Sequence, residues 1–485
     1  MKVLIVNKFL YPNGGSETYI FKLGETLEKK GHEVQYFGME HEGRIVGNEA
    51  ESYTSDMDFH TGRIKKLLYP FQIIYSVEAR KKIRNVLNRF TPDVVHLNNF
   101  NFQLTPSIIY EIRAFEKKTA RKIKIIYTAH DSQFVCPNHL MRNPLTGDIC
   151  TKCIDNGVSN CIKNRCLHGS GTKSLLAAFE HALYHILNTY EEIDCVICPS
   201  EFLKNKLETY KAIRNKLIVM HNFVDRPSIK TEAVIKKDYV VYFGRYSEEK
   251  GIQTLLKVCR RMPEIPFVFV GSGPMEEEIN KVENITNKGF LSGEKLQQII
   301  GEARFSVIPS ECYENCPFSV MESQIYGTPV LGANLGGIPE LISDGETGEL
   351  FTSKNEQARW GAGSKLVTPG SGSSPVTGYM PSLICRSTRR RDCPAGRPPT
   401  TPGPAVICWR LWSTASPRAH RLTSTTLRSP RPSAGRRPLR SSSASWSIWR
   451  GVRTPRPRVG LCCSSCATTS SSGSCSQRKR RSGGL

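Results

Sequence analysis

Short apolar runs alternate with amphipathic helical stretches through the first 351 residues, and this alternation constrains the fold more than any other feature. The chain opens with an apolar run at 3–6, a helical stretch at 17–30 and a second apolar run at 34–37. Further apolar runs follow at 94–97, 123–127, 195–198, 240–243, 267–270, 305–308 and 329–332. Such alternation predicts parallel β-sheets covered by helices on both faces.

The alternation falls into two series. We therefore predict an α/β protein with a first Rossmann-like lobe at 1–221 and a second at 222–357. The stretch at 217–220 and the polar His221-Asn222 pair are expected to form the passage between the lobes. Where two such lobes face a cleft, the cleft is the expected ligand site.

Residues 358–485 break this pattern. Of the 67 Lys and Arg and 44 Asp and Glu in the chain, residues 359–485 hold 23 of the cations and a single acid, Asp392. This Arg/Ser/Pro-rich composition predicts disorder, and the abrupt change favours a non-native or out-of-frame extension. The second lobe is then expected to be incomplete. As an alternative, the tail binds nucleic acid, but such a charge would bind it without sequence specificity.

The sequence also predicts a compartment. No run approaches the roughly 18 apolar residues that span a bilayer, and the opening run is too short for a signal peptide. We therefore expect a cytoplasmic protein. In a reducing compartment, the ten cysteines before residue 359 are thiols or metal ligands rather than disulfides.

A cysteine-rich insertion occupies residues 136–168. Its two close pairs, Cys150 with Cys153 and Cys161 with Cys166, match a tetrahedral zinc site with four thiolate ligands. Such an ion can hold together a short segment that lacks a core, so we predict a structural rather than a catalytic zinc. Free thiols are the alternative interpretation.

Glu314 and Glu322 are the acids whose positions say most about function. They lie eight positions apart, too far to share one helical turn, so the first is expected in a loop and the second in the following helix. The apolar run at 305–308 leads into this loop, and open α/β sheets bind ligands at such strand ends. Carboxylates there suit hydroxyl-rich molecules such as ribose and hexose.

The segment from Glu314 to Glu322, followed by Pro-Val and Gly-Gly-Ile-Pro-Glu, resembles the Glu-x7-Glu signature of retaining glycosyltransferases of family 4, which have the GT-B fold. The resemblance extends to a subgroup with a cysteine-rich insertion. It implies that Glu314 contacts the donor sugar and Glu322 the nucleotide ribose. It also implies that Arg245 and Lys250, after the run at 240–243, hold the diphosphate.

The same resemblance gives further residues a role. It places Gly14 and Gly15 beside the distal phosphate, His130 near the donor sugar, and Phe290 with Leu291 against the base. The first lobe is then the acceptor lobe and the second the nucleotide-sugar lobe. The donor is expected to be a UDP- or GDP-linked sugar, attacked on its front face while the donor phosphate takes the acceptor proton.

The sequence predicts no catalytic divalent cation, because Asp56 and Asp58, an Asp-x-Asp pair, have no apolar run before them. A glycan or lipid-linked acceptor is implied, with contact at the inner membrane face through the mixed basic and apolar segments at 63–71 and 80–84. A solvated helix face is the alternative for these segments. Rival functions are an epimerase or phosphorylase on the same fold, and an inactive nucleotide-sugar-binding remnant.

Overall fold

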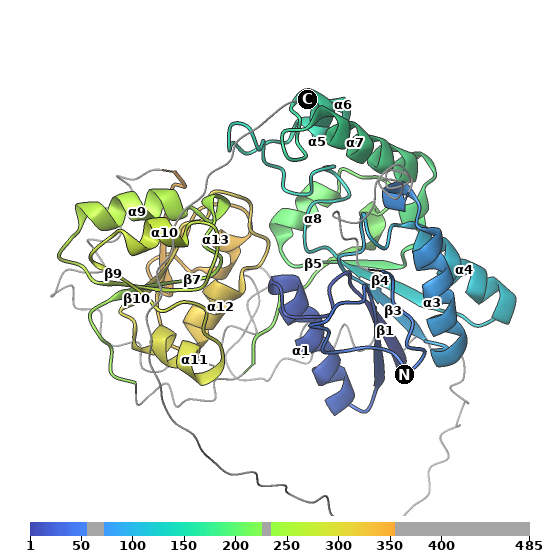
Figure 1. Ribbon diagram of the computed structural model, residues 1–485, viewed down its shortest axis with the longest axis horizontal. Helices are drawn as coiled ribbons and strands as arrows, with labels where there is room; N and C mark the ends of the chain where they lie inside the picture. Colours follow the sequence, from blue (N-terminus) through green and yellow to red (C-terminus); the bar gives the residue numbers. More distant parts are fainter. Residues whose placement is uncertain (56–71, 226–233, 355–485) are drawn as a thin grey trace, which may run out of the picture. The chain divides into compact units, whose positions relative to one another are not determined.

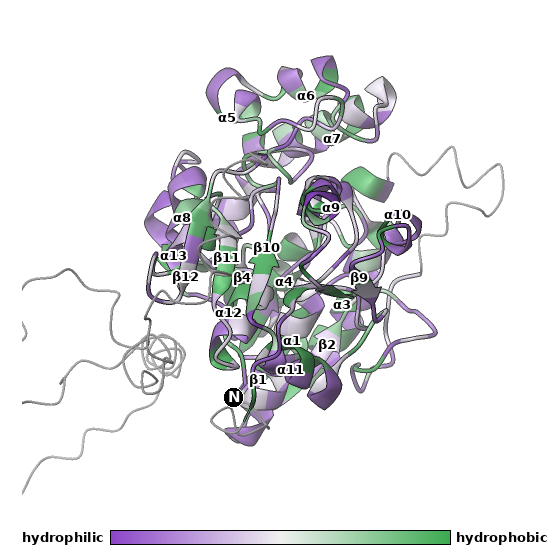
Figure 2. Cartoon of the chain, turned by 90° about the vertical axis from the view of Figure 1, so that its left-hand side faces the viewer, coloured by the Kyte–Doolittle hydropathy of each residue, from purple (hydrophilic) through white to green (hydrophobic). Residues whose placement is uncertain are grey.

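The computed structural model describes residues 1–55, 72–225 and 234–354, which form two six-stranded parallel sheets (Figure 1). The prediction of two Rossmann-like α/β lobes is thereby confirmed. Apolar residues are concentrated in the strands (Figure 2). Across the described residues, no helix is both long and apolar enough to cross a bilayer.

The first sheet has the strand order β2-β1-β3-β4-β5-β6. Val3 to Val6 of β1 pair in parallel with Val34 to Phe37 on one side and with Val94 to Leu97 on the other. The strands are β1 (Lys2–Val6), β2 (Glu33–Phe37), β3 (Val94–Leu97), β4 (Lys124–Thr128), β5 (Cys195–Cys198) and β6 (Leu217–Val219).

Helices cover both faces of this sheet because alternate strand residues point to opposite sides. Val3 and Ile5 pack in one apolar cluster with helix α1 (Gly15–Lys29). Leu4 and Val6 pack in another cluster, with α3 (Val77–Phe90) and α4 (Ser107–Thr119). The insertion after β4 carries α5 (Lys152–Asn156), α6 (Ser159–Lys163) and α7 (Gly171–Ile186), and α8 (Glu201–Leu207) follows β5.

The second sheet has the order β12-β11-β10-β7-β8-β9. Its strands are β7 (Val240–Phe243), β8 (Phe267–Val270), β9 (Ile285–Asn287), β10 (Phe305–Ile308), β11 (Val330–Ala333) and β12 (Gly348–Phe351). Its helices are α9 (Ile252–Arg261), α10 (Glu276–Asn280), α11 (Gly293–Glu302), α12 (Phe318–Ile325) and α13 (Ile338–Leu341). Helices α9 and α10 pack on one face, and α11 packs on the other.

A predicted connection proves to be a strand. Residues 217–220 were expected to form a passage between the lobes, but Leu217–Val219 is strand β6, the last strand of the first sheet. The run is short and only partly buried, so its burial pattern resembles that of a connection. The boundary at residue 221 and the role of the tail stay predictions, because residues 355–485 lie outside the described residues.

The strand orders locate the ligand-binding edges. In the second sheet, β7 lies between β8 and β10, so the loops after β7 and β10 diverge at a topological switch point. In the first sheet, β1 lies between β2 and β3 in the same way. Arg245, Lys250 and Glu314 follow β7 or β10, while Gly14 follows β1. These predicted residues therefore lie at switch points.

Gly251 allows the loops after β7 and β10 to touch. Its φ is +75°, in the left-handed region that favours glycine, and a β-carbon there would lie 1.9 Å from the Pro309 carbonyl oxygen. The adjacent backbone supports the same contact, since Glu311 N donates to Glu249 O at 2.9 Å. This close approach brings the side chains on the two loops within reach of each other.

We expect Gly251→Ala to destabilise the protein much more than Gly327→Ala. Both glycines have a left-handed φ, +75° and +70°, but the space around Gly327 is open. The Gly327 variant therefore carries only the backbone strain of about 1 kcal/mol, whereas the Gly251 variant also forces two loops apart. Thermal unfolding should show a further drop of roughly 5 °C or more for Gly251→Ala. Equal melting temperatures would contradict the steric argument.

Candidate functional site

Lys250 and Glu314 form an ion pair at the carboxyl edge of the second sheet. Lys250 Nζ lies 2.6 Å from Glu314 Oε1, and Ser310 Oγ donates to the same oxygen at 2.8 Å. Lys250 ends the turn after β7, while Ser310 and Glu314 belong to the loop after β10. The pair thus joins the two loops that diverge at the switch point.

Glu314 is ionised because it is paired. Burial alone would raise the pKa of its carboxyl, but the charge of Lys250 and the hydrogen bonds from Lys250 and Ser310 hold the pKa below its ordinary value. Burial likewise opposes the charge on Lys250, and Glu314 outweighs it, so the pKa of Lys250 is raised. The two groups therefore keep opposite charges at neutral pH and neutralise each other.

Gly336 and Gly337 fix the backbone that carries Glu314. A β-carbon on Gly336 would lie 2.4 Å from Glu314 O, and a β-carbon on Gly337 would lie 1.8 Å from Asn315 O. Gly337 N also donates to Glu314 O at 2.6 Å. The loop after β11 thus packs against the loop after β10, and only glycine permits this contact. Three loops of one sheet edge hold the acid in place.

Glu340 is the last residue of the Gly-Gly-Ile-Pro-Glu motif that begins at Gly336, and it makes a different contact. Its carboxylate accepts from the backbone N–H groups of Glu201 at 2.8 Å and Phe202 at 2.6 Å, in the first turn of α8. A carboxylate at a helix N-terminus is favourable because the N–H groups there lack partners within the helix. Glu340 therefore acts as a helix cap in this structure.

Arg245 and Glu322 stand apart from the ion pair. Arg245 is exposed after β7, and within the described residues its guanidinium makes no ion pair. Glu322 is half-buried in α12; burial raises its pKa, and the charge of Lys22 offsets part of this shift. In the described residues, no hydrogen bond joins either side chain to Lys250 or Glu314. The structure thus brings two of the four charged residues into direct contact.

Phe290 and Leu291 follow β9 but face different surroundings. The Phe290 ring is exposed, whereas Leu291 packs against the apolar cluster that contains Val241 and Phe243. Of this pair, Phe290 is therefore the side chain with a ring face open to a planar ligand.

Gly14 and Gly15 mark the start of α1, where sequence reasoning overlooked a neighbouring acid. Glu17 is buried in the first turn and accepts hydrogen bonds at 2.9 Å from Asn7 Nδ2 and from Ser16 Oγ. A β-carbon added to Gly14 would lie 3.5 Å from Glu17 Oε2. The helix N-terminus thus already faces a carboxylate, which weakens the expectation of a phosphate beside these glycines.

His130 follows β4 and is held by Asn98. The Asn98 amide donates to Val6 O at 3.4 Å and to His96 O at 3.2 Å, so its Oδ1 accepts from His130 Nε2 at 2.9 Å. This network assigns the proton to Nε2 and leaves Nδ1 as an acceptor. Burial lowers the pKa of His130 to about 4, partly offset by Asp131. The imidazole is therefore neutral at physiological pH.

The loop of Glu314 reaches the backbone of His130. Asn315 Nδ2 donates to His130 O at 2.6 Å. Neither Asn98 nor Asn315 was singled out from the sequence, although each has a recognisable position: Asn98 directly follows an apolar strand, and Asn315 follows Glu314. For Asn98, its place immediately after an apolar run was the available signal.

The four cysteines predicted as zinc ligands line one small cavity. Cys150, Cys153, Cys161 and Cys166 surround a volume of about 10 Å³, and Cys136 joins them as a fifth thiol. Burial raises the pKa of Cys153 to about 12, and the nearby thiols add to the shift. In the described parts of the chain, however, no three His, Cys, Asp or Glu side chains are arranged to hold a metal ion. The thiols thus gather as the sequence predicts, while the zinc ion itself stays a prediction.

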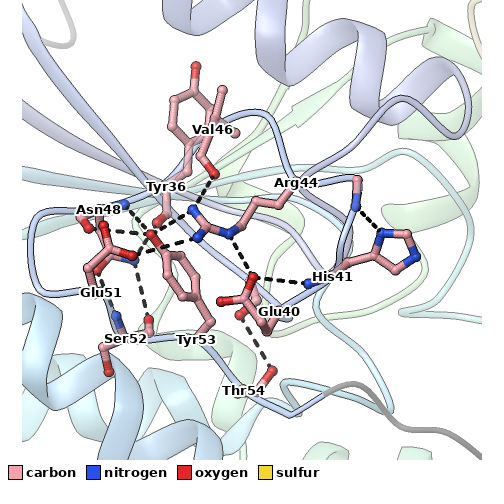
Figure 3. A network of polar contacts seen from close by, with 12 residues as sticks. Tyr36, Glu40, His41, Arg44, Val46, Asn48, Glu51, Ser52, Tyr53 and Thr54 are labelled. Carbon is pink, nitrogen blue, oxygen red and sulfur yellow. Dashed lines mark hydrogen bonds and ion pairs between the residues drawn. The ribbon is translucent and has the colours of Figure 1, made fainter. Parts of the chain in front are cut away.

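A polar network after β2 was also missed by sequence reasoning (Figure 3). Arg44 donates to Glu40 Oε1 at 2.9 Å and to the Tyr53 hydroxyl at 3.0 Å, and its guanidinium lies 4.0 Å from the Tyr53 ring centre. Asn48 Nδ2 donates to Tyr36 O at 2.9 Å. An open surface hollow of about 500 Å³ is lined by residues of this network and by none of the predicted site residues. The network ties the loop to the edge strand.

The basic segment at 80–84 proves to be partly neutralised. Arg80 and Arg84 both pair with the buried Glu111, at 2.9 and 2.5 Å. The hydrogen bond from Arg84, with a further one from Arg80, outweighs burial and leaves the pKa of the Glu111 carboxyl below its ordinary value. These arginines hold α3 against α4. The segment at 63–71, and Asp56 with Asp58, lie outside the described residues.

We expect the Lys250–Glu314 pair to stabilise the fold at pH values between the ordinary pKa of glutamate, 4.5, and that of lysine, 10.5. Glu314 contributes stability above its unfolded value of 4.5 and loses it as pH falls through its lower folded value. Lys250 contributes below 10.5 and loses its contribution as pH rises through its higher folded value. Lys250→Met leaves the acid unpaired, and because the lysine is about one third exposed, 32%, the cost should be about 2 kcal/mol.

Denaturant unfolding of Lys250→Met and Lys250→Arg at pH 7 and pH 3 measures this contribution. The arginine variant keeps the charge and should lose less stability. The penalty of the methionine variant should shrink at pH 3, where protonation of Glu314 removes the buried charge. A penalty independent of pH would show that Lys250 acts through packing alone.

Comparisons with known proteins agree with this architecture. Residues 13–226 match the family model described as Glycosyltransferase Family 4, and residues 237–367 match the one described as Glycosyl transferases group 1. Sulfoquinovosyl transferase SQD2 from Arabidopsis thaliana is 34% identical over 122 residues, 24% of each chain. A 2-deoxystreptamine N-acetyl-D-glucosaminyltransferase from Niallia circulans is 32% identical over 134 residues, 25% of this chain and 34% of the relative. The chain thus spans less than two thirds of these relatives.

A solved structure supports the same fold. Sucrose-phosphate synthase from Thermosynechococcus elongatus superimposes with a TM-score of 0.52 at 16% identity, covering 76% of this chain and 89% of that one. An identity this low shows the fold alone. With both lobes matched by glycosyltransferase models and each lobe built on a parallel α/β sheet, the chain belongs to the glycosyltransferases of the family 4 type.

Proposed function

We propose that this chain transfers a sugar from a nucleotide-diphosphate donor to a hydroxyl of a glycan or lipid-linked acceptor, with retention at the anomeric carbon. The observation that carries the proposal is the Lys250–Glu314 ion pair at the switch point of the second sheet. Arg245 follows the same strand as Lys250 and lacks an ion-pair partner in the described chain. Two cations and one oriented acid suit a diphosphate joined to a sugar.

The proposed step breaks the bond between the anomeric carbon and the diphosphate oxygen. A bond to the acceptor oxygen forms on the same face, and the acceptor proton passes to the departing phosphate, giving a glycoside and a nucleoside diphosphate. Arg245 and Lys250 would stabilise the charge that builds on the leaving group. The fixed cations then come from the protein itself, and we propose a reaction that needs no divalent metal ion.

Glu314 is proposed to orient the donor sugar. Its Oε1 is occupied by Lys250 and Ser310, so its Oε2 is the oxygen that would accept from a sugar hydroxyl. His130 would present Nδ1 as a neutral acceptor rather than as a general base, because its pKa of about 4 leaves it a weak base. Glu322, half-buried in α12, is proposed to meet the ribose.

The names of the two relatives denote transfer of different sugars, sulfoquinovose and N-acetyl-D-glucosamine. TarM from S. aureus, which has a TM-score of 0.50 and 12% identity, has been crystallised with UDP. These similarities favour a sugar nucleotide without choosing among UDP- and GDP-linked hexoses. The exposed Phe290 ring offers stacking to either base.

We expect a matching nucleotide sugar to raise the melting temperature of the full chain, since a ligand that binds the native state stabilises it by mass action. A panel of UDP- and GDP-linked sugars tests this. Arg245→Ala should weaken binding at least tenfold by removing a charged contact to the diphosphate. Arg260→Ala, an exposed cation on α9, is the matched control and should bind as wild type.

Product analysis separates the rival functions. A new glycoside with retained anomeric configuration supports the proposal, whereas an epimerised sugar nucleotide or a sugar phosphate points to the related reactions. Binding without turnover, for a donor that stabilises the chain, identifies an inactive remnant. If no sugar nucleotide stabilises the protein and Arg245→Ala behaves as Arg260→Ala does, the proposed donor site is wrong.

We also propose a structural zinc ion in the cysteine cavity, separate from the reaction. Its support is the gathering of five thiols around a volume of about 10 Å³, the size of one small sphere and too little for an organic ligand. Tetrahedral thiolate sites need four such ligands, and small shifts of side chains would have to complete the geometry. Cys136 would tie the loop after His130 into the site.

Elemental analysis of the purified chain should find about one zinc per molecule. Cys153→Ser and Cys166→Ser should lower this content, because each removes a donor from the cavity. Cys195→Ser is the control, since Cys195 lies in β5 and does not line the cavity. Protein free of zinc after expression in zinc-supplemented medium would leave these residues as ordinary thiols.

A further inference from the structure

A short hairpin in the cysteine-rich insertion contacts the second lobe. The chain folds back on itself over residues 142–149, where Asn143 N donates to Asp148 O at 2.8 Å. The Arg142 guanidinium braces this turn, since its Nε donates to Gly147 O at 3.2 Å. The φ of Gly147 is +71°, in the left-handed region that favours glycine, so the chain can turn tightly there. We call residues 142–149 the insertion hairpin.

Two cation–acid contacts join the insertion hairpin to the second lobe. Arg142 Nη2 lies 3.3 Å from Glu248 Oε1, in the turn after β7. Lys354, which follows β12, places its Nζ 3.2 Å from Asp148 Oδ1 and donates to Gly147 O at 2.9 Å. The insertion hairpin thus contacts two separate segments of the second lobe.

Both of these segments are linked to the Lys250–Glu314 ion pair. Glu248 begins the short turn that ends at Lys250. Ser353, next to the lysine of the second contact, donates from its Oγ to Ser310 O at 2.9 Å, and Ser310 Oγ donates to Glu314 at 2.8 Å. The insertion hairpin therefore contacts the immediate neighbours of each partner in the ion pair.

The base of the insertion hairpin is part of the cysteine cavity. Arg142 and Cys150 both line this cavity. Cys136 Sγ donates to Asn138 Oδ1 at 2.8 Å, and Asn138 Nδ2 donates to Arg142 O at 2.8 Å. Cys150 N, just after the hairpin, donates to Met141 O at 2.8 Å. The gathered thiols thus fix the backbone from which the Arg142 side chain extends.

The two contacts are effective only because the insertion hairpin is already fixed. The side chains of Glu248 and Asp148 are 66% and 69% exposed, and solvent screens such ion pairs so that each stabilises little by itself. The Arg142 side chain, in contrast, is 12% exposed and has little freedom to lose. A rigid segment that makes two weak contacts pays the ordering entropy once, so the contacts reinforce each other.

We propose that the insertion hairpin is a clasp that holds the turn of Lys250 and the loop of Glu314 in the arrangement that receives the donor diphosphate. Arg142 is then a positioning residue, because it acts through the turn that Glu248 begins. The cysteine cavity is connected to the donor site through this clasp. The effect on sugar transfer rests on the proposed function, whereas the effect on the order of the two loops does not.

Amide hydrogen exchange of the full chain tests the clasp without any ligand. The N–H groups of Lys250 and Gly251 are hydrogen-bonded within the turn and are therefore the reporters. We expect Arg142→Ala to speed their exchange about threefold, as for the loss of one exposed ion pair, and the addition of Lys354→Met to bring this to about tenfold. Arg142→Ala and Glu248→Ala should not be additive, because both remove the same contact.

Lys163→Ala is the matched control. It removes an exposed cation from α6 of the same insertion, which makes no ion pair within the described residues, so exchange in the turn should stay as in the wild type. Arg142→Lys keeps the charge and should retain most of the protection. If Arg142→Ala folds poorly, Glu248→Ala removes the same contact from its exposed side. Exchange at Lys250 that is unchanged in the folded variants overturns the clasp.

Donor binding separates this inference from the proposed function. For a sugar nucleotide that stabilises the wild type, Arg142→Ala should weaken binding about threefold and Arg142→Lys less, because the turn of Lys250 becomes less ordered. Faster exchange with unchanged donor affinity overturns the positioning role of Arg142. Faster exchange in a chain that binds no sugar nucleotide supports the clasp and rejects the proposed function instead.

Discussion

Close backbone contact between neighbouring loops is the constraint on which the second-lobe site depends. Gly251 lies against Pro309, and Gly336 with Gly337 lies against the backbone of Glu314 and Asn315. A β-carbon at any of these three glycines would overlap a carbonyl oxygen. Because the loops after β7, β10 and β11 are locked in this way, Lys250 meets Glu314 with little freedom to move. The ion pair is a consequence of how the loops pack.

Burial and charge are balanced differently in the two lobes. In the second lobe, burial opposes both charges of the ion pair, and mutual attraction outweighs it. In the first lobe, the charge of Asp131 raises the pKa of His130, but burial outweighs it and keeps the imidazole neutral. A donor in the proposed site would therefore meet an exposed Arg245, a neutralised pair and a neutral imidazole. Such a site avoids holding unpaired charge in a buried environment before its ligand arrives.

The sequence predicted the buried apolar strands well and the partly buried ones poorly. The strands at Val94–Leu97, Cys195–Cys198 and Phe305–Ile308 have the predicted bounds, since each is a fully or largely buried apolar run. Strands β6 and β9 have three residues each and no fully buried residue, so they lack that signal. Among the site residues, Lys250 and Glu314 were identified. Asn98, Ser310 and Glu17 were not, because their importance lies in what they contact.

By itself, the sequence determined the α/β class, the two sheets, and the positions of the charged residues after strand ends, because local periodicity states which residues must be buried. Only the tertiary structure decided that Lys250 pairs with Glu314, 64 positions away, and that Cys136 joins the other four thiols. It alone placed Glu17 beside Gly14. These outcomes depend on strand order and loop contact, which bring distant residues together and are not encoded in any local pattern.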